Sequence, residues 1–254
     1  MKIVAVIPAH LASIRFPRKI LFALYGLPMI EHVRRRALMS DVISDVVVAT
    51  CDEEIAGVVR GFGGKVIMTA NTHTNGTSRV AEAVKDIDCT HVMLLQGDEP
   101  LLLPRHLDIL AQTIEKNSEG DAWNATGPIE DQGELDRHSF VKCVISQSER
   151  ILYCFRRTPC FCDFKKQQRF VRKILGIIAY RKDFLLHLTR LPLALVEQAE
   201  LIEQMRIIEN DFRLQSVPVS PSLPSVNEPE EAEIVLGYIR QNTEQRELLE
   251  QVVR

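Results

Sequence analysis

The sequence contains no long hydrophobic run. Of its 254 residues 46% are hydrophobic, but no segment approaches the roughly 20 consecutive apolar residues that a membrane-spanning helix needs. The first apolar run, Ile3–Ile7, is also shorter than the apolar core of a signal peptide, which has about 7–15 residues. We therefore expect a cytoplasmic protein with neither a membrane span nor a signal peptide.

The sequence also has little net charge and no paired cysteine motif. Because the formal net charge is −3, no general basic field is available to attract nucleic acid, and we expect no nucleic-acid partner. The six cysteines form no C-x-x-C unit. The nearest approach to a zinc pattern is Cys154, Cys160 and Cys162. Reduced and mostly buried thiols are the preferred interpretation.

The first half of the chain alternates short β-rich apolar runs with amphipathic segments. The strands that this pattern predicts are Ile3–Ile7, Val46–Thr50, Lys65–Met68 and His91–Leu95. The helices that it predicts are Pro28–Met39, Glu53–Phe62, Ser78–Ile87 and Leu107–Lys116. This order favours an α/β fold with a mainly parallel sheet covered by helices on both faces. In such sheets, ligands bind beyond the carboxyl ends of the strands.

The second half is less regular. The pattern predicts strands at Val141–Ser146, Ile151–Phe155, Leu175–Tyr180 and Gln215–Val219, and helices at Val196–Glu209 and Glu230–Arg240. The sharpest change in organisation lies near residues 120–140. We expect one domain over residues 1–254, with a small β-containing subregion at about 120–190. We also expect the C-terminal helices to pack on the first half.

A basic loop follows the first predicted strand. It contains Ser13 and, within five residues, Arg15, Arg18 and Lys19. Cations at this position can neutralise a triphosphate and the charge that develops at phosphorus during transfer. The loop lacks the glycines of a P-loop and of the G-x-G-x-x-G motif, which excludes both. A solvated basic turn is the alternative interpretation.

Two further polar segments lie at the ends of predicted elements. Gln96-Gly97-Asp98-Glu99-Pro100 directly follows a strand, where a carboxylate suits Mg²⁺ and Gly97 allows close approach of a ligand. Asn75-Gly76-Thr77 precedes a helix and can read a nucleobase. The alternatives are a strand-ending turn for the first segment and, for the second, helix capping by Thr77 or Ser78, which is favoured.

These segments, in this order and spacing, resemble those of the 3-deoxy-manno-octulosonate (KDO) cytidylyltransferases, and the similarity runs nearly end to end. It rests on Ile7-Pro8-Ala9 with Ser13-x-Arg15-x-Pro17-x-Lys19, Gly26-x-Pro28-Met29-Ile30-x-His32-Val33, Asn75-Gly76-Thr77-x-Arg79, Gln96-Gly97-Asp98-Glu99-Pro100, Leu175-Gly176-Ile177 with Tyr180-Arg181, and Glu200-x-x-Glu203-Gln204-x-Arg206. The resemblance implies a three-layer nucleotide-diphospho-sugar transferase-like fold. It also implies a homodimer, and acceptor-binding and dimerisation roles for the subregion at about 120–190.

The resemblance further implies that CTP and an acidic sugar form a CMP-activated sugar and release pyrophosphate, with Mg²⁺ as cofactor. The catalytic residues that it implies are Arg15, Lys19 and Asp98. The nucleotide-binding residues are Ala9, His10, Ser13, Arg18, Asn75, Gly76, Thr77 and Gln96. The acceptor-binding residues are Arg156, Glu200, Gln204, Ile174 and Ile178. The metal ligands are Asp98 with Asn227 or Glu228.

Several positions depart from the family pattern near the expected phosphates and metal. His10 stands where an arginine that contacts phosphate is usual, and Arg18 can partly restore the lost charge. Asn227 stands where the family has a second metal-binding aspartate. Its carbonyl can still coordinate, and Glu228 can supply the charge after a shift of backbone. These changes leave open a nucleotide-binding relative without turnover.

Departures in the expected sugar pocket replace polar groups by apolar ones. Ile174 and Ile178 stand where a histidine and a tyrosine are expected, and Phe155 replaces a small polar residue. Hydroxyl groups of KDO would lose hydrogen-bond partners there, which weakens discrimination. The acceptor is therefore KDO or a modified KDO-like sugar acid. Another acidic acceptor, such as a different nonulosonic acid or a phosphonate, is the alternative.

Overall fold

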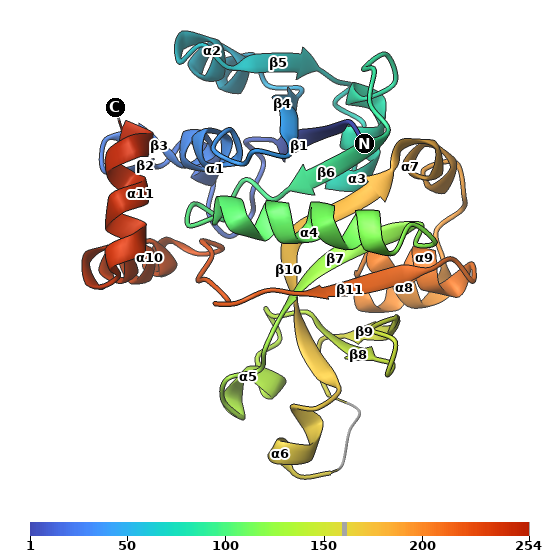
Figure 1. Ribbon diagram of the computed structural model, residues 1–254. Helices are drawn as coiled ribbons and strands as arrows, with labels where there is room; N and C mark the ends of the chain where they lie inside the picture. The colour runs from blue at the N-terminus through green and yellow to red at the C-terminus, as the bar shows by residue number, and fades with distance from the viewer. Residues whose placement is uncertain (159–161, 254) are drawn as a thin grey trace. The chain divides into compact units, whose positions relative to one another are not determined.

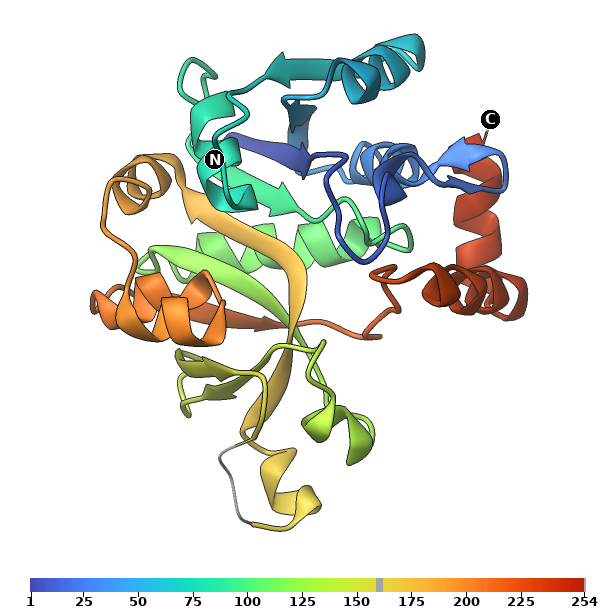
Figure 2. The ribbon, with the colours of Figure 1, turned by 180° about the vertical axis from the view of Figure 1, so that it is seen from behind.

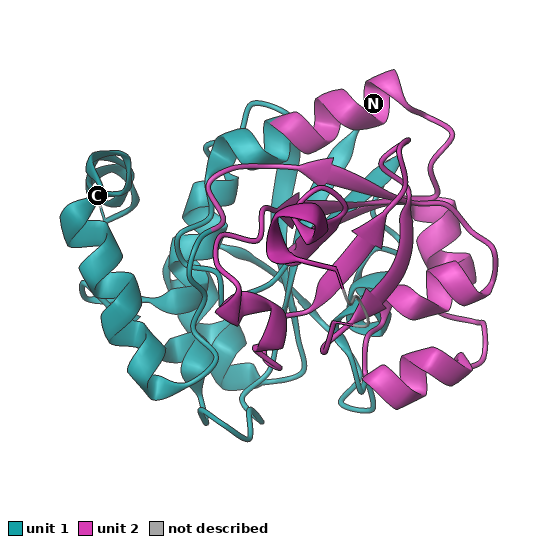
Figure 3. Cartoon of the chain, turned by 90° about the horizontal axis from the view of Figure 1, so that it is seen from below, with its two compact units in different colours: residues 1–108, 223–254 teal, residues 109–222 magenta. Residues whose placement is uncertain are grey.

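The computed structural model describes residues 1–158 and 162–253. The chain divides into two compact units, shown in teal and magenta in Figure 3. Unit 1 comprises Met1–Asp108 and Leu223–Arg254, and unit 2 comprises Ile109–Ser222. The expectation of one domain, with an acceptor and dimerisation subregion at about 120–190, stays a prediction. Within the described ranges, no helix is both long and apolar enough to cross a membrane.

Strands β1 (Ile3–Ala9), β4 (Ile43–Thr50), β5 (Lys65–Met68) and β6 (His91–Leu95) build a parallel sheet in unit 1 (Figure 1). β1 pairs with β4 on one side and with β6 on the other, and β5 pairs with β4. Nearly every side chain of β1 is buried, as in a strand covered on both faces. The prediction of an α/β fold with a mainly parallel sheet is confirmed.

Helices follow these strands as the sequence predicts. In chain order they are α1 (Met29–Ala37), α2 (Glu53–Gly61), α3 (Gly76–Ala83) and α4 (Pro104–Lys116). A short 3₁₀ helix, η1 (Lys19–Leu21), and a hairpin of β2 (Ala23–Leu24) and β3 (Leu27–Pro28) precede α1. α2 stops where Gly63 takes a φ of +73°, because a left-handed residue after the last turn lets the chain close the helix.

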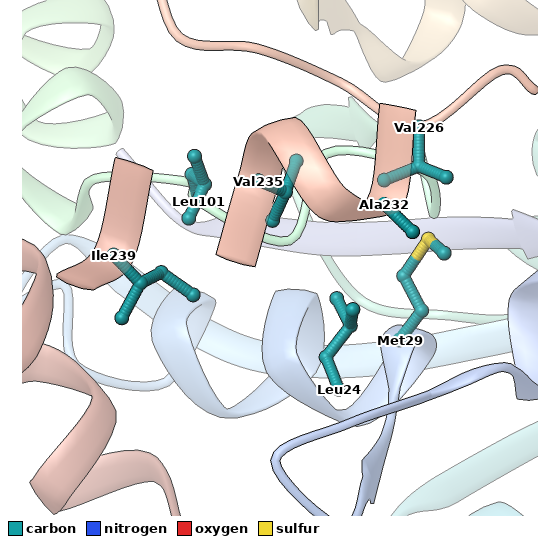
Figure 4. Packing of buried hydrophobic residues seen from close by; sticks show 7 residues of the cluster. All are labelled: Leu24, Met29, Leu101, Val226, Ala232, Val235 and Ile239. Carbon is teal, nitrogen blue, oxygen red and sulfur yellow. The ribbon is translucent and has the colours of Figure 1, made fainter. Parts of the chain in front are cut away.

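The C-terminal helices α10 (Pro229–Gln241) and α11 (Thr243–Val253) belong to unit 1. Figure 4 shows the apolar side chains that hold α10. They form one buried cluster of Leu24, Met29, Leu101, Val226, Ala232, Val235 and Ile239. Each such aliphatic side chain stabilises the fold by about 1.5–3 kcal/mol when fully buried. The prediction that the C-terminal helices pack on the first half is confirmed, and the packing fixes the segment around Val226 next to the residues after β6.

Unit 2 is built on five strands within its described residues: β7 (Ala122–Gly127), β8 (Lys142–Ile145), β9 (Ile151–Phe155), β10 (Val171–Arg181) and β11 (Leu214–Pro218). β7 pairs in parallel with β11 and antiparallel with β10. β8 joins β10 and β9, both antiparallel, and Figure 2 shows this hairpin beside β10. The short helices of unit 2 are α5 (Gly133–Asp136), α6 (Phe164–Gln167), α7 (Lys182–Leu188), α8 (Leu195–Glu200) and α9 (Gln204–Glu209).

The predicted helix Val196–Glu209 is wrong, because two helices, α8 and α9, replace it. Leu201 between them has a φ of +56°, which a continuous right-handed helix does not allow. The fold-back brings Arg206 to Glu197, with Nη2 2.5 Å from Oε1 and both side chains almost fully buried. Periodicity could not reveal this break, since the ion pair forms only once the chain has turned.

The cysteines only partly match their prediction. Those that the structure describes carry free thiols, but only Cys143 and Cys154 are buried, while Cys51, Cys89 and Cys162 are half-buried. Cys160 lies outside the described residues. Among the residues that are described, no cluster of three or more His, Cys, Asp or Glu side chains could hold a metal. The zinc interpretation of Cys154 and Cys162 therefore gains no support.

Candidate functional site

Unit 1 has a cavity of about 560 Å³, which is lined by residues at the carboxyl ends of β1 and β6. Three segments that the sequence analysis singled out meet there: the loop after β1, the turn before α3 and the segment after β6. The lining residues that were predicted as a site are Ala9, His10, Ser13, Lys19, Asn75, Gly76, Gln96, Gly97 and Asp98. This is the location that the parallel-sheet rule predicts for a ligand.

The central feature of the cavity is an ion pair between Lys19 and Asp98. Lys19 Nζ lies 2.5 Å from Asp98 Oδ2, and the side chains are only 14% and 20% exposed. Lys19 Nζ also donates to the backbone oxygen of Val226 at 3.3 Å. The Val226 N–H donates to the backbone oxygen of Asp98 at 2.9 Å. The ammonium group of Lys19 is thus held by Asp98 and Val226, which lie 79 and 207 positions later in the sequence.

Gly97 has no room for a side chain. A Cβ atom at this position would lie 2.9 Å from Ile20 Cδ1 and 3.4 Å from Ile7 Cγ2. A side chain at position 97 would therefore displace the end of the Ile20 side chain, so the glycine permits the close packing of β1 and η1 on the segment that carries Asp98. Whether it also allows close approach of a ligand stays a prediction.

Replacing Gly97 by alanine is expected to lower the free energy of unfolding by about 1–3 kcal/mol, because the added methyl group overpacks a tight contact. Thermal unfolding and pyrophosphate release would measure the loss of stability and of activity. Gly57→Ala is the matched control, since a Cβ there meets nothing within 4 Å on the exposed side of α2. That control is expected to stabilise by about 0.5–1 kcal/mol, and equal effects of the two substitutions would contradict the packing argument.

Arg15 and Arg18 contact carboxylates rather than the cavity. Arg15 Nη1 lies 3.7 Å from Glu228 Oε1, with each side chain about half exposed. Arg18 pairs with Glu54, at the start of α2. Among the described residues, neither arginine lines the cavity, and Thr77 does not line it either. Because exposed ion pairs contribute only about 0–1 kcal/mol, a triphosphate can compete for both arginines, and their nucleotide-binding roles stay predictions.

The turn before α3 is organised by Asn75. Its Oδ1 accepts from the Ser78 N–H at 2.8 Å, which makes Asn75 the N-cap of α3. The alternative interpretation, capping by Thr77 or Ser78, named the wrong residues. Gly76 lies against Pro8 at the end of β1, where a Cβ would be 3.2 Å from Pro8 Cγ. This close contact joins the turn to the loop after β1.

The lining residues that were not among the predicted site residues include three with charged or imidazole side chains, Asp52, His73 and Arg79. Asp52 Oδ2 accepts from the Leu11 N–H at 2.9 Å and so anchors the loop after β1. Arg79 is almost fully buried, and its Nη1 donates to Thr69 Oγ1 at 2.7 Å. His73 pairs with Glu82. The position of Asp52, two residues after the end of β4, was a usable signal, whereas the burial of Arg79 could not be read from the sequence.

His10 does not supply the charge of the arginine usual at its position. The pKa of His10 lies below its ordinary value, because the ring is partly desolvated at the cavity wall, although the residue is exposed, and because the nearby charge of Arg79 opposes protonation. The ring is therefore mainly neutral near pH 7. Arg18 also leaves this charge unreplaced in the structure, because it is paired with Glu54.

The predicted acceptor-binding polar residues lie in unit 2 and already have protein partners. Arg156 donates to the backbone oxygens of Glu200 at 3.1 Å, His138 at 3.2 Å and Leu201 at 3.3 Å. Gln204 Nε2 donates to Asn124 Oδ1 at 3.1 Å. Arg156 therefore holds the end of α8, and binding of an acceptor by Arg156, Glu200 or Gln204 stays a prediction.

The apolar departures fall on buried or half-buried positions of unit 2. Ile178 is buried and Ile174 half-buried in β10, on either side of a shift in its register with β7. Phe155 is 1% exposed and packs in a cluster with Ile129, Leu135 and Val171. A small polar residue at position 155 would leave a void there, so the phenylalanine has a packing role in this chain.

Comparison with known proteins shows the family of this chain. The family model described as Cytidylyltransferase matches residues 4–215. A 3-deoxy-manno-octulosonate cytidylyltransferase from Chlorobium limicola is 36% identical over 248 residues, covering 95% of this chain and 99% of the relative. The enzyme of the same name from Escherichia coli is 36% identical over 228 residues, covering 90% and 92%.

Solved structures show the same relation. CMP:2-keto-3-deoxy-manno-octonic acid synthetase complexed with CTP superposes with a TM-score of 0.89 at 34% identity, covering 95% of this chain and 99% of the other. The inositol-1-phosphate CTP transferase from T. maritima has a TM-score of 0.66 at 13% identity, covering 99% and 96%, and shares the fold alone. With this match and the cavity around Lys19 and Asp98, the chain belongs to the 3-deoxy-manno-octulosonate cytidylyltransferase family and is a nucleotidyltransferase.

Proposed function

We propose that this enzyme transfers CMP from CTP to KDO or a modified KDO-like sugar acid and releases pyrophosphate. The observation that carries the proposal is the cavity of unit 1, where the Lys19–Asp98 pair lies beside Gln96 and the Asn75–Gly76 turn. A cation and a carboxylate at the carboxyl end of a parallel sheet suit a metal-bound triphosphate. The relatives named above carry the same activity in their names.

In the proposed reaction the anomeric hydroxyl oxygen of the sugar acid attacks the α-phosphorus of CTP, and the bond to pyrophosphate breaks. Lys19 neutralises negative charge on the phosphates, because its ammonium group offers three donors and exchanges the Asp98 carboxylate for phosphate oxygens. Gln96 and the Asn75 turn bind the cytosine, and Ser13 and Arg15 bind the triphosphate. Positioning and charge neutralisation are sufficient for this kind of transfer.

The residues present fit a divalent cation. Asp98 uses Oδ2 for Lys19, so Oδ1 lies outside that ion pair. Asn227 donates through Nδ2 to Ser225 Oγ at 3.0 Å, and its carbonyl oxygen takes no part in that bond. Mg²⁺ needs only one or two protein oxygens when phosphates complete its shell. Asp98 and Asn227 would hold Mg²⁺, which would stabilise charge on the phosphates.

Asn227 is favoured over Glu228 as the second metal ligand because the two residues have different neighbours. Asn227 directly follows a residue that is bonded to Asp98, whereas the Glu228 side chain contacts Arg15. Glu231 Oε2 accepts from the backbone N–H groups of Asn227 at 2.6 Å and of Glu228 at 3.1 Å. Val226 directly before them is bonded to Asp98. The Glu228 carboxylate contacts Arg15 instead.

Asn227→Asp is expected to lower the Mg²⁺ concentration for half-maximal activity about tenfold, because an added ligand charge strengthens binding of a hard cation. A Mg²⁺ titration of pyrophosphate release would measure this. Glu228→Gln is the matched control in the adjacent position and is expected to leave the Mg²⁺ titration unchanged. A shift caused by Glu228→Gln, with none from Asn227→Asp, would assign the ligand to Glu228.

The direct test of the function uses purified protein with CTP, Mg²⁺ and a panel of ulosonic acids. We expect pyrophosphate release with KDO or a modified KDO, and much less with ATP or UTP. The side chains of Ile174 and Ile178 favour an acid that lacks or replaces hydroxyl groups of KDO. The absence of turnover with every acid of the panel would contradict the proposal.

Two alternatives have specific observations behind them. The apolar residues Ile174 and Ile178 motivate a different acidic acceptor, another nonulosonic acid or a phosphonate, which mass spectrometry of CMP adducts would detect. A neutral His10 and the change at Asn227 motivate a CTP-binding relative without turnover. Tight CTP binding without Mg²⁺-dependent turnover would establish the latter.

A homodimer and a cytoplasmic location are part of the same proposal. Large apolar side chains are exposed on and around α8, with Leu195 82% and Leu201 77% accessible. Large apolar side chains exposed to this extent favour a protein contact where they adjoin one another, and a second copy of the chain is the proposed partner. Light scattering of Leu195→Ser against the unmodified protein would test it. The cytoplasmic location stays a prediction from the sequence.

A further inference from the structure

The side-chain amide of Asn124, in the middle of β7, is fully buried and has a fixed orientation. Its Nδ2 donates to the backbone oxygens of Ala125 at 2.9 Å, Leu175 at 3.0 Å and Ile177 at 3.2 Å. A reversed amide would place Oδ1 against three carbonyl oxygens, which cannot donate. Asn124 Oδ1 must therefore face the other way, as an acceptor.

That acceptor determines the orientation of Gln204. Its Nε2 donates to Asn124 Oδ1 at 3.1 Å, and the opposite amide orientation would place two oxygens together. Gln204 lies at the start of α9 and is half-buried. With its NH₂ group directed to Asn124, the amide presents Oε1 elsewhere. Gln204 Oε1 is therefore held as a hydrogen-bond acceptor directed away from Asn124.

Asn124 also fixes the segment of β10 that carries the two isoleucines. In the pairing of β10 with β7, Ile174 lies opposite Thr126 and Ile178 opposite Asn124, with a register shift between them. The carbonyls of Leu175 and Ile177 lie inside that shift, and both accept from Asn124. A single buried amide thus joins the irregular segment of β10 to Gln204 on α9.

We propose that Asn124 is a specificity-determining positioning residue, which holds Gln204 so that its Oε1 accepts a hydrogen bond from a hydroxyl or amine group of the sugar acid. This inference rests on the proposed function, because it assigns Gln204 to the acceptor. Asn124 itself contacts no substrate. Its role is to exclude the reversed orientation of the Gln204 amide, so that a ligand offering only acceptor atoms to Oε1 binds poorly.

The test compares Asn124→Leu with Thr126→Val. Asn124→Leu removes the four hydrogen bonds of the Asn124 amide. Thr126→Val removes one buried hydrogen bond from the same strand, that of Thr126 Oγ1 with Ser216 Oγ at 2.8 Å, and it leaves the bond to Gln204 in place. Asn124→Leu is expected to raise KM for the sugar acid about tenfold with KM for CTP within twofold, the size of one lost hydrogen bond. Thr126→Val is expected to change neither KM, although both variants lower the unfolding temperature.

A double-mutant cycle separates positioning from a general loss of structure. In a Gln204→Met background, Asn124→Leu is expected to add nothing to KM for the sugar acid, because the group that it orients is gone. Additive effects, or an equal rise in KM from Thr126→Val, would overturn the proposal.

A readout in the free protein keeps the proposal testable if no acid is turned over. The side-chain NH₂ resonances of Gln204, assigned by their loss in Gln204→Met, are expected to show slow hydrogen exchange that becomes at least tenfold faster in Asn124→Leu but not in Thr126→Val. Unchanged exchange would refute the orientation by Asn124. If the unmodified enzyme turned over no acid but the expected hydrogen-exchange pattern of Gln204 was observed, only the proposed function would be refuted.

Discussion

Asp98→Asn is expected to lower kcat/KM for CTP by about 10²–10³-fold, equivalent to roughly 3–4 kcal/mol of lost transition-state stabilisation. Two causes act together. The substitution removes the carboxylate proposed to hold Mg²⁺, and it leaves the Lys19 ammonium group, only 14% exposed, without its counter-charge. Initial rates of pyrophosphate release over a range of Mg²⁺ concentrations would measure the effect.

The neighbouring substitution Glu99→Gln is the control for Asp98→Asn. It removes a negative charge one residue away and is expected to leave kcat/KM within a few fold. If saturating Mg²⁺ restored full activity to Asp98→Asn, the residue would serve metal affinity only. If the activity of Asp98→Asn were unchanged at every Mg²⁺ concentration, the central assignment of the site would be wrong.

Lys19→Met is expected to reduce kcat by about 10²–10³-fold, the size seen when one preorganised charge-stabilising donor is removed. Methionine keeps much of the length of the side chain but has no donor for phosphate oxygens. It also leaves Asp98 beside the Val226 carbonyl without a cation, so we expect weaker CTP binding as well. Steady-state kinetics and calorimetric titration with CTP would separate the two effects.

Lys2→Met provides the matched control for Lys19→Met. Lys2 pairs with Asp88 at 2.7 Å, but both side chains are at least half exposed, so its loss is expected to cost at most about 1 kcal/mol of stability and no activity. The double variant Lys19→Met with Asp98→Asn is expected to be far less impaired than the product of the two single effects, because Lys19 and Asp98 act as one unit. Strict multiplication would show that the ion pair is incidental to the reaction.

The parallel sheet of unit 1 was predictable because its signals are local. Each predicted strand from Ile3–Ile7 to His91–Leu95 is a compact apolar run between turn residues, and Gly63 marks the end of α2. The edge where ligands bind follows from topology alone. The order of strands and loops in the sequence is therefore enough to place the three polar segments together, and the cavity contains residues from all of them.

Unit 2 was predicted only in part. The strands β8 to β11 follow predicted apolar runs, but β7 was not predicted, because some determinants of this unit are not local. β7 carries Asn124 and Thr126 within a fully buried strand, and such polar residues interrupt the apolar pattern by which strands are recognised. Their burial is tolerated only because carbonyls of β10 and a hydroxyl of β11 satisfy them. The break at Leu201 likewise depends on the ion pair between Glu197 and Arg206.

By itself, the sequence determined the fold class, the family and the segments that line the cavity of unit 1, since these depend on residue types at short spacing. Only the tertiary structure decided what the individual side chains do. It paired Lys19 with Asp98 and Val226, turned Arg15 and Arg18 to carboxylates, and fixed Gln204 through Asn124. Partners so distant along the chain are selected by packing and by the need of every buried polar atom for a hydrogen bond, which no local pattern encodes.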